Sequence, residues 1–382
     1  MKIGFDGKRA AQNRTGLGNY SRFVLRILSE QHPENEYHLF MPKRHKTPFL
    51  HEIPTLKSLY CHFPVTPMAR RLASLWRVWG MDNDLRREGI EVFHGLSNEL
   101  PLSIRKAGCR SVVTIHDLIF LRYPQYYRPI DRIIYNYKFR RACINADRII
   151  AVSEFTKQEI IHFYGIAPDK IEVVYQGCDR IFAQKPSQEQ MDEVRQHYHL
   201  PQRFLLYVGS IEERKNLLLV AKALRQMKET GTPADSLPHV VAVGKRTPYT
   251  DKLQSFLSIH GLTSSFTFLH GVGYNHLPVL YHLATAFVYP SRIEGFGIPL
   301  LEAITASLPA IGCTGSCLEE AGGEGCLYVH PDDAQGMADA IRRVMDDETL
   351  RAKLIVRGQQ HARQFDEEVL CRELMRVYAT LQ

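Results

Sequence analysis

Two glutamates, Glu294 and Glu302, stand on either side of a glycine loop in the stretch YPSRIEGFGIPLLE. Gly295 and Gly297 let backbone amides approach a ligand closely, and Pro299 suits the first turn of a following helix. A helix N-terminus attracts anions such as a diphosphate, and nearby carboxylates accept hydrogen bonds from sugar hydroxyls. Either glutamate alone is better explained by a favourable contact with a helix dipole. The whole block favours a site for a phosphorylated sugar.

A second stretch, YVGSIEERKNL, supplies the cations that such a ligand requires. Its strand pattern ends at Gly209, and Arg214, Lys215 and Asn216 follow near the start of the next predicted helix. When a diphosphate leaves, negative charge grows on its oxygens, and a fixed cation pair stabilises that charge. Charge-assisted hydrogen bonds of this type contribute about 1.5–3 kcal/mol each. A solvated basic turn is the alternative for an isolated Arg-Lys pair, but the position after the first strand of the second half favours the site.

The first half of the chain carries two weaker signals. In RTGLGNYS, Gly16 and Gly18 follow a predicted strand in a loop that faces phosphate or acceptor, although the spacing matches a dinucleotide fingerprint poorly. In VVTIHDLIF, His116 and Asp117 lie at the carboxyl end of a predicted strand, where open α/β sheets place ligands. A turn capped by the aspartate is the structural alternative.

These stretches resemble the family 4 retaining glycosyltransferases, whose signature is a pair of glutamates with seven residues between them in an EGFGxPxxE setting. The resemblance implies that Glu294 binds hydroxyls of the transferred sugar and that Glu302 binds the ribose of the nucleotide. It also implies that Arg214 and Lys215 bind the diphosphate. His116 would contact the transferred sugar at the reaction centre.

The site residues implied by the resemblance come from both halves of the chain. Many family members carry an arginine directly after the glycine that ends the strand, where this chain has Ser210, so the phosphate contacts differ in detail. No metal ion and no other cofactor is implied. The catalytic set is His116, Arg214, Lys215 and Glu294. The donor-binding set is Gly16, Gly18, Gly209, Ser210, Arg214, Lys215, Glu294, Gly295, Phe296, Gly297, Ile298 and Glu302.

Strand and helix patterns alternate along all 382 residues, which predicts two α/β domains with parallel sheets covered by helices. The resemblance implies the GT-B fold, two facing Rossmann-like domains with a deep cleft between them. We expect an acceptor domain at 1–178, a nucleotide-sugar domain at 179–365 and a final helix at 366–382 that crosses back to the first. The predicted strands are Lys2–Asp6, Tyr37–Phe40, Glu91–His94, Ser111–Ile115, Arg148–Val152, Phe204–Val208, Val240–Val243, Phe266–Leu269 and Phe287–Tyr289; the predicted helices include Asn19–Ser29, Ile130–Asn145 and Asp366–Leu381.

The composition is that of an ordinary globular protein, with 45% hydrophobic and 23% charged residues. No apolar run approaches the ~18 residues that span a bilayer, and MKIGFDGKRA lacks the apolar core of a signal peptide, so we expect a cytoplasmic protein. The eight cysteines form no C-x-x-C pair and are expected to be reduced and structural. Asp82-Asn83-Asp84 mimics a D-x-D metal motif, but it lies far from the donor stretches in sequence and is expected at the surface.

Positive charge is concentrated in the first half. Residues 1–180 carry 28 Lys and Arg against 18 Asp and Glu, whereas residues 181–382 carry 20 against 23. The first half is therefore expected to meet an acidic partner, namely nucleic acid, the inner face of an anionic membrane or a phosphorylated acceptor. The stretch Met68–Gly89 combines Trp76 and Trp79 with five arginines, and it either touches anionic lipid or packs its apolar side chains inward.

We expect a retaining glycosyltransferase of surface polysaccharide or lipopolysaccharide assembly. It moves a hexose from a nucleotide-diphosphate sugar to a glycan or lipid-linked acceptor, and GDP-mannose is the preferred donor because of an overall likeness to mannosyl- and rhamnosyltransferases. A nucleotide-sugar epimerase of the same fold is the nearest alternative. A nucleic-acid-binding protein ranks low because the basic residues are dispersed. A regulatory subunit that binds a nucleotide sugar without turnover stays open.

Overall fold

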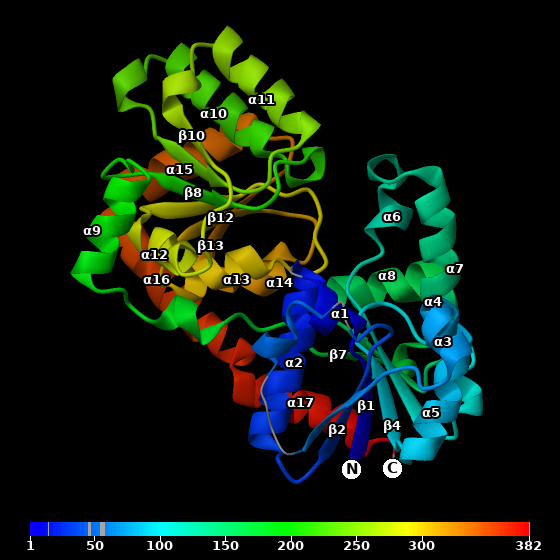
Figure 1. The fold of residues 1–382 in the computed structure, drawn as a ribbon. Coiled ribbons are helices and arrows are strands. Elements are labelled where there is room, and N and C mark those ends of the chain that lie inside the picture. Colours follow the sequence, from blue (N-terminus) through cyan, green and yellow to red (C-terminus); the bar gives the residue numbers. More distant parts are fainter. Residues whose placement is uncertain (14, 45–46, 54–57, 382) are drawn as a thin grey trace. The chain divides into compact units, whose positions relative to one another are not determined.

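The computed structural model describes residues 1–13, 15–44, 47–53 and 58–381 (Figure 1). The chain divides into two compact units. Unit 1 comprises Met1–Gly177 together with Phe365–Gln382, and unit 2 comprises Cys178–Gln364. The expected domains began and ended within one residue of these limits. The orientation of one unit toward the other is not determined, so each is described by itself.

Unit 1 contains a seven-stranded parallel sheet within the part of the chain that the structure describes. The strands are β1 (Lys2–Asp6), β2 (Glu36–Phe40), β3 (Leu59–His62), β4 (Val92–Gly95), β5 (Arg110–Ile115), β6 (Arg148–Ala151) and β7 (Ile171–Val173). Their order is β3-β2-β1-β4-β5-β6-β7, so the direction of the sheet order reverses between β1 and β4. In open α/β sheets ligands bind outside the carboxyl ends of the strands at such a switch point.

Helices cover both faces of this sheet, and each face has its own apolar core. The helices of unit 1 are α1 (Lys8–Gln12), α2 (Gly16–Gln31), α3 (Pro67–Arg71), α4 (Ala73–Leu75), α5 (Met81–Glu88), α6 (Ile119–Arg122), α7 (Pro129–Asn145), α8 (Glu154–Tyr164) and α17 (Glu367–Ala379), with a π-helical turn at Trp76–Gly80. On one face α2 and α17 pack against Ile3, Phe5 and Tyr37 (Figure 1). On the other face α5, α7 and α8 pack against Phe93 and Ile115. The continuous apolar character of the inner strands follows from this double cover.

The last helix, α17, belongs to unit 1 although it follows unit 2 in sequence. It presents Leu370, Leu374 and Val377 to the core at helical spacing. At its start, Arg26 of α2 forms two hydrogen bonds, of 2.9 and 2.7 Å, with the buried carboxylate of Glu367. The expected return of the final helix to the first domain is therefore observed.

Unit 2 repeats the same architecture with a six-stranded parallel sheet. Its strands are β8 (Leu205–Val208), β9 (Val240–Val243), β10 (Phe266–Leu269), β11 (Ala286–Tyr289), β12 (Ala310–Cys313) and β13 (Cys326–Val329), and its helices are α9 (Gln188–His197), α10 (Leu217–Glu229), α11 (Pro248–Ile259), α12 (His276–Leu283), α13 (Ile298–Thr305), α14 (Leu318–Gly322), α15 (Ala334–Asp346) and α16 (Glu348–Ala362). The order is β10-β9-β8-β11-β12-β13, with the switch point between β8 and β11. This is the strand order of Rossmann folds.

Four strands were missed by the sequence prediction, namely β3, β7, β12 and β13. Each is only three or four residues long, and β3 (LYCH) and β7 (IEV) mix polar with apolar residues. Gly16 and Gly18 were predicted in a loop, but α2 already begins at Gly16, so both lie in its first turn. Arg14, the first residue of the RTGLGNYS stretch, lies outside the described residues.

The prediction that Asp82-Asn83-Asp84 lies at the surface was wrong for both aspartates, which are buried on the inner side of α5. Asp84 accepts a hydrogen bond of 2.6 Å from the indole nitrogen of Trp76. Asp82 accepts one of 3.1 Å from Ser103. These carboxylates therefore anchor the helix within unit 1, as structural groups.

The Met68–Gly89 stretch packs partly inward and leaves part of its apolar surface exposed. Trp76 is buried, whereas Trp79 is 52% exposed. Arg77 is buried and pairs with Asp6 and Glu99. Within the residues that are described, none of the helices has both the length and the hydrophobicity that a membrane crossing requires.

Candidate active site

The charged residues of the candidate site follow two neighbouring strands of unit 2. Arg214 and Lys215 come after β8, in a short 3-10 helix (Glu213–Lys215) that leads into α10. Glu294 comes after β11, in the loop that leads into α13. Because β8 and β11 pair in parallel at the switch point, their carboxyl ends bring both loops to the same edge of the sheet. Residues 79 positions apart in sequence are thereby brought into contact.

Glu294 forms a dense set of short contacts with the cations. Its Oε1 lies 2.9 Å from Nζ of Lys215, and its Oε2 lies 3.0 Å from Nη1 of Arg214. Oε1 also accepts hydrogen bonds from the hydroxyl groups of Ser291 (2.7 Å) and Tyr289 (3.0 Å). The carboxylate side chain is 13% exposed. A carboxylate so enclosed is held in one orientation before any ligand arrives.

The ionisation of Glu294 follows from these partners. Burial by itself would raise the pKa of this carboxyl group, but Lys215 and Arg214 together with the Ser291 hydroxyl lower it to about 2. Glu294 is therefore an anion at neutral pH, flanked by two cations. Arg214 is fixed further by a hydrogen bond of 2.7 Å from Nη1 to the carbonyl of Ile293.

Glu302 lies in the second turn of α13 and has a different environment. Its Oε2 accepts a hydrogen bond of 2.7 Å from the hydroxyl of Tyr281 on α12. Burial raises the pKa of Glu302, the Tyr281 hydrogen bond lowers it and Asp179 raises it slightly, so that together they set it at about 7. The two glutamates of one sequence motif thus have pKa values shifted in opposite directions, because only Glu294 has cations beside it.

The predicted glycine positions have steric reasons. Gly209 has a φ of +154°, and a Cβ there would lie 3.1 Å from the Lys215 side chain. Gly297, with a φ of +110°, precedes α13, and a Cβ there would lie 2.7 Å from Leu318. A side chain at either position would be strained and would displace the loop. Pro299 lies in the first turn of α13, as the sequence predicted.

The remaining predicted donor residues lie around these loops. Ser210 follows Gly209, and its carbonyl accepts a hydrogen bond of 2.9 Å from the hydroxyl of Tyr207. Phe296 is buried, and Ile298 is the first residue of α13. Gly295 stands beside Glu294 in the same loop. All of them therefore belong to unit 2, at the edge that carries the charged cluster.

His116 occupies the corresponding edge of unit 1, after β5. Its ring is buried and makes two hydrogen bonds, from Nε2 to the carbonyl of Leu96 (2.9 Å) and between Nδ1 and the amide nitrogen of Gln176 (2.9 Å). A carbonyl only accepts, so Nε2 carries the proton and Nδ1 accepts from Gln176. Burial lowers the pKa of His116 to about 4. The imidazole is therefore neutral, and its orientation is fixed.

The other predicted residues of unit 1 have structural contacts. A Cβ on Gly18 would lie 1.8 Å from the carbonyl oxygen of Asn13, so only glycine fits there. Gly16 is exposed with open space around it. Oδ1 of Asp117 accepts a hydrogen bond of 3.2 Å from the amide of Ile119, which is the turn cap considered as its alternative role.

Sequence reasoning missed the aromatic hydroxyl groups that hold the glutamates. Tyr289 appeared only as the last residue of a predicted strand, and Ser291 only as part of the quoted stretch. Tyr281 gave no signal at all, since it lies in the apolar helix HLPVLYHL and meets Glu302 only in the folded chain. A buried tyrosine inside an apolar helix is usually a core residue, so its spacing could not distinguish this role.

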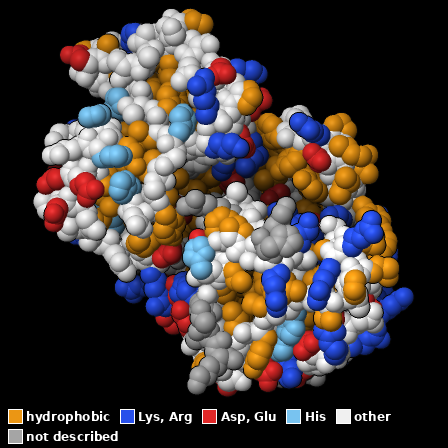
Figure 2. Space-filling view, viewed as in Figure 1, with side chains coloured by type: hydrophobic (Ala, Val, Ile, Leu, Met, Phe, Trp, Pro, Cys, Tyr) orange, Lys and Arg blue, Asp and Glu red, His pale blue; other side chains and the backbone are white. Residues whose placement is uncertain are grey.

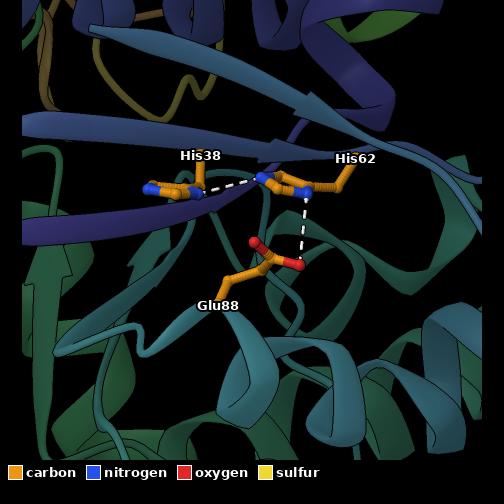
Figure 3. Close-up of side chains that lie close together, drawn as sticks. All are labelled: His38, His62 and Glu88. Carbon is orange, nitrogen blue, oxygen red and sulfur yellow. Dashed lines mark hydrogen bonds and ion pairs between the residues drawn. The ribbon is translucent and has the colours of Figure 1, made fainter.

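Another polar group of the described residues is His38, His62 and Glu88 in unit 1, whose types could hold a metal ion (Figure 3). Nδ1 of His38 and Nε2 of His62 are 2.9 Å apart, and the rings are 12° from parallel. The two nitrogens face each other end to end (Figure 3). A zinc ion would need both lone pairs directed at a common point about 2.1 Å away. The geometry is that of a hydrogen-bonded histidine pair, with Glu88 3.8 Å from the far nitrogen of His62.

Comparison with known families agrees with this geometry. The model for Glycosyltransferase Family 4 matches residues 21–182, and that for Glycosyl transferases group 1 matches residues 190–361. The chain belongs to these glycosyltransferase families. The first match lies in unit 1 except for its last few residues, which belong to unit 2. The second match lies within unit 2 and contains the whole charged cluster.

Curated relatives and solved structures extend the match. The chain is 27% identical to O-antigen chain mannosyltransferase B of Escherichia coli over 100% of both chains. It is 30% identical to O-antigen chain mannosyltransferase RfbU of Salmonella typhimurium over 61% of this chain and 60% of that protein. Sucrose-phosphate synthase of Thermosynechococcus elongatus has a TM-score of 0.78 at 19% identity, covering 100% of this chain and 99% of the other. HepE of Anabaena, solved with UDP-glucose, has a TM-score of 0.75 at 18% identity over 100% of both. The structural likeness shows the GT-B fold of this glycosyltransferase.

Proposed function

We propose that this glycosyltransferase moves a mannosyl residue from GDP-mannose to a glycan or lipid-linked acceptor, with retention of anomeric configuration and without a metal ion. The two O-antigen relatives, both named mannosyltransferases, support mannose as the sugar. The observation that carries the proposal is the cluster of Arg214, Lys215 and Glu294 at the switch point of unit 2. It provides positive charge and an oriented acceptor of hydrogen bonds within one small region.

The chemistry of the proposed transfer uses the cluster directly. The bond between the anomeric carbon and the diphosphate oxygen breaks, and the acceptor hydroxyl oxygen forms its new bond to that carbon on the same face. The hydroxyl proton passes to the departing phosphate oxygen. Lys215 and Arg214 stabilise the charge that grows on the diphosphate, the kind of stabilisation that usually contributes most to catalysis. Because two cations are present, the proposal needs no metal ion.

The two glutamates would bind different parts of the donor. Glu294 is ionised and fixed, so it accepts hydrogen bonds from hydroxyls of the transferred sugar. Glu302, in the second turn of α13, would bind the ribose hydroxyls, and its hydrogen bond from Tyr281 would set its orientation. In unit 1, neutral His116 would contact the transferred sugar through its ring edge or by exchanging its Gln176 hydrogen bond for a sugar hydroxyl.

Two measurements test the proposal. Thermal-shift screening against GDP-, UDP-, ADP- and dTDP-sugars identifies the donor, because a bound ligand raises the apparent stability by mass action. GDP-mannose is expected to give the largest shift. NMR of the product then reports the anomeric configuration, which should equal that of the donor. The transfer should proceed equally well with and without EDTA.

The alternatives give different results in the same experiments. Conversion of the donor to another nucleotide sugar without an acceptor would indicate an epimerase. Binding without transfer or hydrolysis across the donor panel would indicate a regulatory subunit. A stable gel shift with nucleic acid at physiological salt would favour the nucleic-acid-binding alternative. Any of these results would contradict the proposed transfer reaction.

We further propose that unit 1 contacts an anionic membrane, where lipid-linked acceptors reside. Apolar side chains of α7 are exposed to solvent, among them Ile133 at 66% and Ile130 at 60%. Figure 2 shows hydrophobic side chains gathered over α7 with Lys and Arg beside them. The α7 sequence carries one aspartate against four Arg and Lys. Exposed apolar surface next to basic residues is typical of helices that lie at a lipid surface.

A second exposed segment adjoins α7. Met68 and Leu72 at α3 are exposed together with Trp79. Glu99 joins the two regions, since it bonds Arg77 of the π-helical turn at 2.8 Å and Lys138 of α7 at 3.3 Å. The membrane contact expected for Met68–Gly89 alone is thus proposed for that segment together with α7.

Vesicle co-sedimentation tests the membrane contact. Replacing Ile130 and Ile133 by Ser should reduce binding to vesicles that contain phosphatidylglycerol by about tenfold or more, because two large apolar side chains each contribute about 1.5–3 kcal/mol when buried. Ile259→Ser is the matched control, since Ile259 is 79% exposed in unit 2. Equal binding by both variants would contradict a membrane contact through α7.

A further inference from the structure

A cavity of about 600 Å³ lies in unit 1, apart from the residues assigned to the transfer reaction. Its walls include the segment Pro42–Arg44, which follows β2, and the segment His62–Val65 at the end of β3. β2 and β3 are parallel neighbours at one side of the sheet, two and three positions from β4. The cavity is therefore at the carboxyl edge of the sheet. It lies away from the switch point between β1 and β4, and away from His116, which follows β5.

Five cations line this cavity. Among the described residues at its wall there is no aspartate or glutamate. Such an arrangement costs free energy through repulsion between like charges, and that cost is removed when an anion enters. The five cations are Lys43, Arg44, Arg70, Arg71 and Arg87.

Three of the guanidinium groups are held in place by their neighbours. Cζ of Arg44 lies 5.2 Å from the centre of the Phe63 ring. Nε of Arg70 donates a hydrogen bond of 3.2 Å to the carbonyl of Pro64. Arg87 pairs with Glu88 at 3.0 Å and with Asp84. These contacts orient the groups in advance, so less conformational entropy is lost when a ligand binds.

The other two cations are available to a ligand. Within the described part of the chain, the ammonium group of Lys43 and the guanidinium group of Arg71 have no hydrogen-bond or ion-pair partner. Both side chains are exposed. Guanidinium groups bind phosphate oxygens through paired, charge-assisted hydrogen bonds, and lysine adds a compact point charge.

We infer that this cavity binds a phosphate or diphosphate ester, most directly the phosphorylated linkage of the acceptor. The volume is large enough for a diphosphate with part of an attached sugar. The acceptor assignment rests on the proposed function. The same chemistry is offered by a phospholipid headgroup, because the cavity shares Arg70, Arg71 and Arg87 with the Met68–Gly89 segment of the proposed membrane contact.

Titration of the full chain with pyrophosphate at low salt tests the cavity. Pyrophosphate should occupy two sites, the Arg214/Lys215 pair in unit 2 and the cavity in unit 1. The double variant Lys43→Ala/Arg71→Ala should weaken the cavity site about tenfold or more and leave the other unchanged, because two charge-assisted contacts are lost. Lys215→Ala should weaken pyrophosphate binding at the Arg214/Lys215 pair and leave the cavity site unchanged. Raising the salt concentration should weaken both sites.

A matched control removes the same charges elsewhere in unit 1. Lys106→Ala/Arg110→Ala takes one lysine and one arginine from exposed positions outside the cavity, with Arg110 at the opposite, amino end of β5. It should bind pyrophosphate as the unmodified chain does. Identical titrations for the cavity variant and this control would overturn the inference.

Two further measurements identify the source of the phosphate. If the cavity holds the acceptor, Lys43→Ala/Arg71→Ala raises the KM for a lipid-diphosphate acceptor about tenfold with the donor KM and kcat unchanged. If it holds a headgroup, the variant instead loses binding to phosphatidylglycerol vesicles and keeps its acceptor KM, which supports the site and rejects the acceptor assignment. A chain that transfers no sugar would refute the proposed function, while the pyrophosphate titration would still decide on the cavity.

Discussion

The two units have the same strand order around a switch point, but different groups follow the strands: in unit 1 Asp6 at the end of β1 is paired with Arg77, and His116 follows β5, beside the switch-point strand β4. In unit 2 the loops after β8 and β11 bring together Arg214, Lys215 and an ionised Glu294. In unit 1 the corresponding edge holds a neutral His116, bonded to a carbonyl and to the amide of Gln176. One topology therefore provides two kinds of site, and the loop residues decide which kind it becomes.

The difference matches the two parts of the donor in the proposed reaction, the diphosphate and the transferred sugar. A nucleotide diphosphate is doubly charged and becomes more so as it leaves, which calls for fixed cations. A sugar hydroxyl is neutral and calls for oriented hydrogen bonds. The experiments below change one residue at a time to test whether the two edges really differ in this way, from the largest expected effect to the smallest.

Lys215→Ala should have the largest effect. Removal of one charge stabiliser from the diphosphate should lower kcat about 10²–10³-fold, by analogy with the loss of one oxyanion-hole donor. Steady-state kinetics measure this, with Lys252→Ala as control, since Lys252 is an exposed lysine of α11 in the same unit. A Lys215→Ala protein with full kcat would remove the reason to call this edge a diphosphate site.

Glu294→Gln and Glu302→Gln should change the free energy of unfolding in opposite directions. The folded pKa of Glu294, about 2, lies below the ordinary 4.5, so its stabilising contribution is present above pH 4.5 and lost as the pH falls toward 2. Glu294→Gln should therefore destabilise the protein at pH 7, by roughly 2–3 kcal/mol.

Glu302 has the reverse sign. Its folded pKa, about 7, lies above 4.5, so its contribution is present below pH 4.5 and lost as the pH rises through 7. Glu302→Gln should match the unmodified protein at pH 5 and exceed its stability at pH 8 by roughly 2 kcal/mol. Denaturant unfolding at both pH values measures the two differences, and the same sign for both glutamates would contradict the assigned environments.

Gln176→Ala should affect the neutral edge more mildly. It removes the hydrogen bond that Nδ1 of His116 accepts, which contributes about 1 kcal/mol to orientation and should lower kcat by roughly three- to tenfold. The imidazole of the unmodified protein should stay neutral from pH 8 down to pH 5, because burial lowers its pKa to about 4. NMR of the ring nitrogens checks this. A His116 that is protonated at pH 6 would carry a positive charge, which would contradict the neutral imidazole assigned to unit 1.

Ser210→Arg should give the smallest change. It restores the arginine that many family members carry after the glycine, and adds a third cation beside the loop that begins at Gly209. An exposed charge of this kind contributes less than about 1 kcal/mol, so the donor KM should fall by at most about fivefold at low salt, and less at high salt. A much larger fall in the donor KM would mean that Arg214 and Lys215 are poorly placed to bind the diphosphate.

The charged edge of unit 2 was accessible from sequence because its signals are local. Gly209 and Gly297 mark backbone positions whose conformations other residues rarely adopt, and Pro299 marks the first turn of α13; all three lie in or beside the loops that carry the charged residues. The apolar strands β8 and β11 before them were found to within one residue. Tyr281 was beyond reach, since its contact with Glu302 depends on how α12 packs beside α13.

The neutral edge of unit 1 was harder to predict for the same reason. His116 was identified from its position after a strand, but its partners Leu96 and Gln176 lie 20 and 60 residues away and are joined to it only by the sheet. The short strand β3 was missed, and with it the cavity that its residues Cys61 and His62 help to line. Long-range contacts of neutral groups leave no spacing pattern in a sequence.

The return of α17 to unit 1 also determines the order in which the protein can be completed during synthesis. Unit 2 leaves the ribosome as an uninterrupted stretch, Cys178–Gln364, whereas the sheet of unit 1 waits for residues beyond Phe365 before one of its apolar faces is covered. Until then α2 packs against Ile3, Phe5 and Tyr37 without α17, so this core is only partly covered. The N-terminal half should therefore be the last to reach its native state, and the part of the nascent chain that most needs chaperone protection.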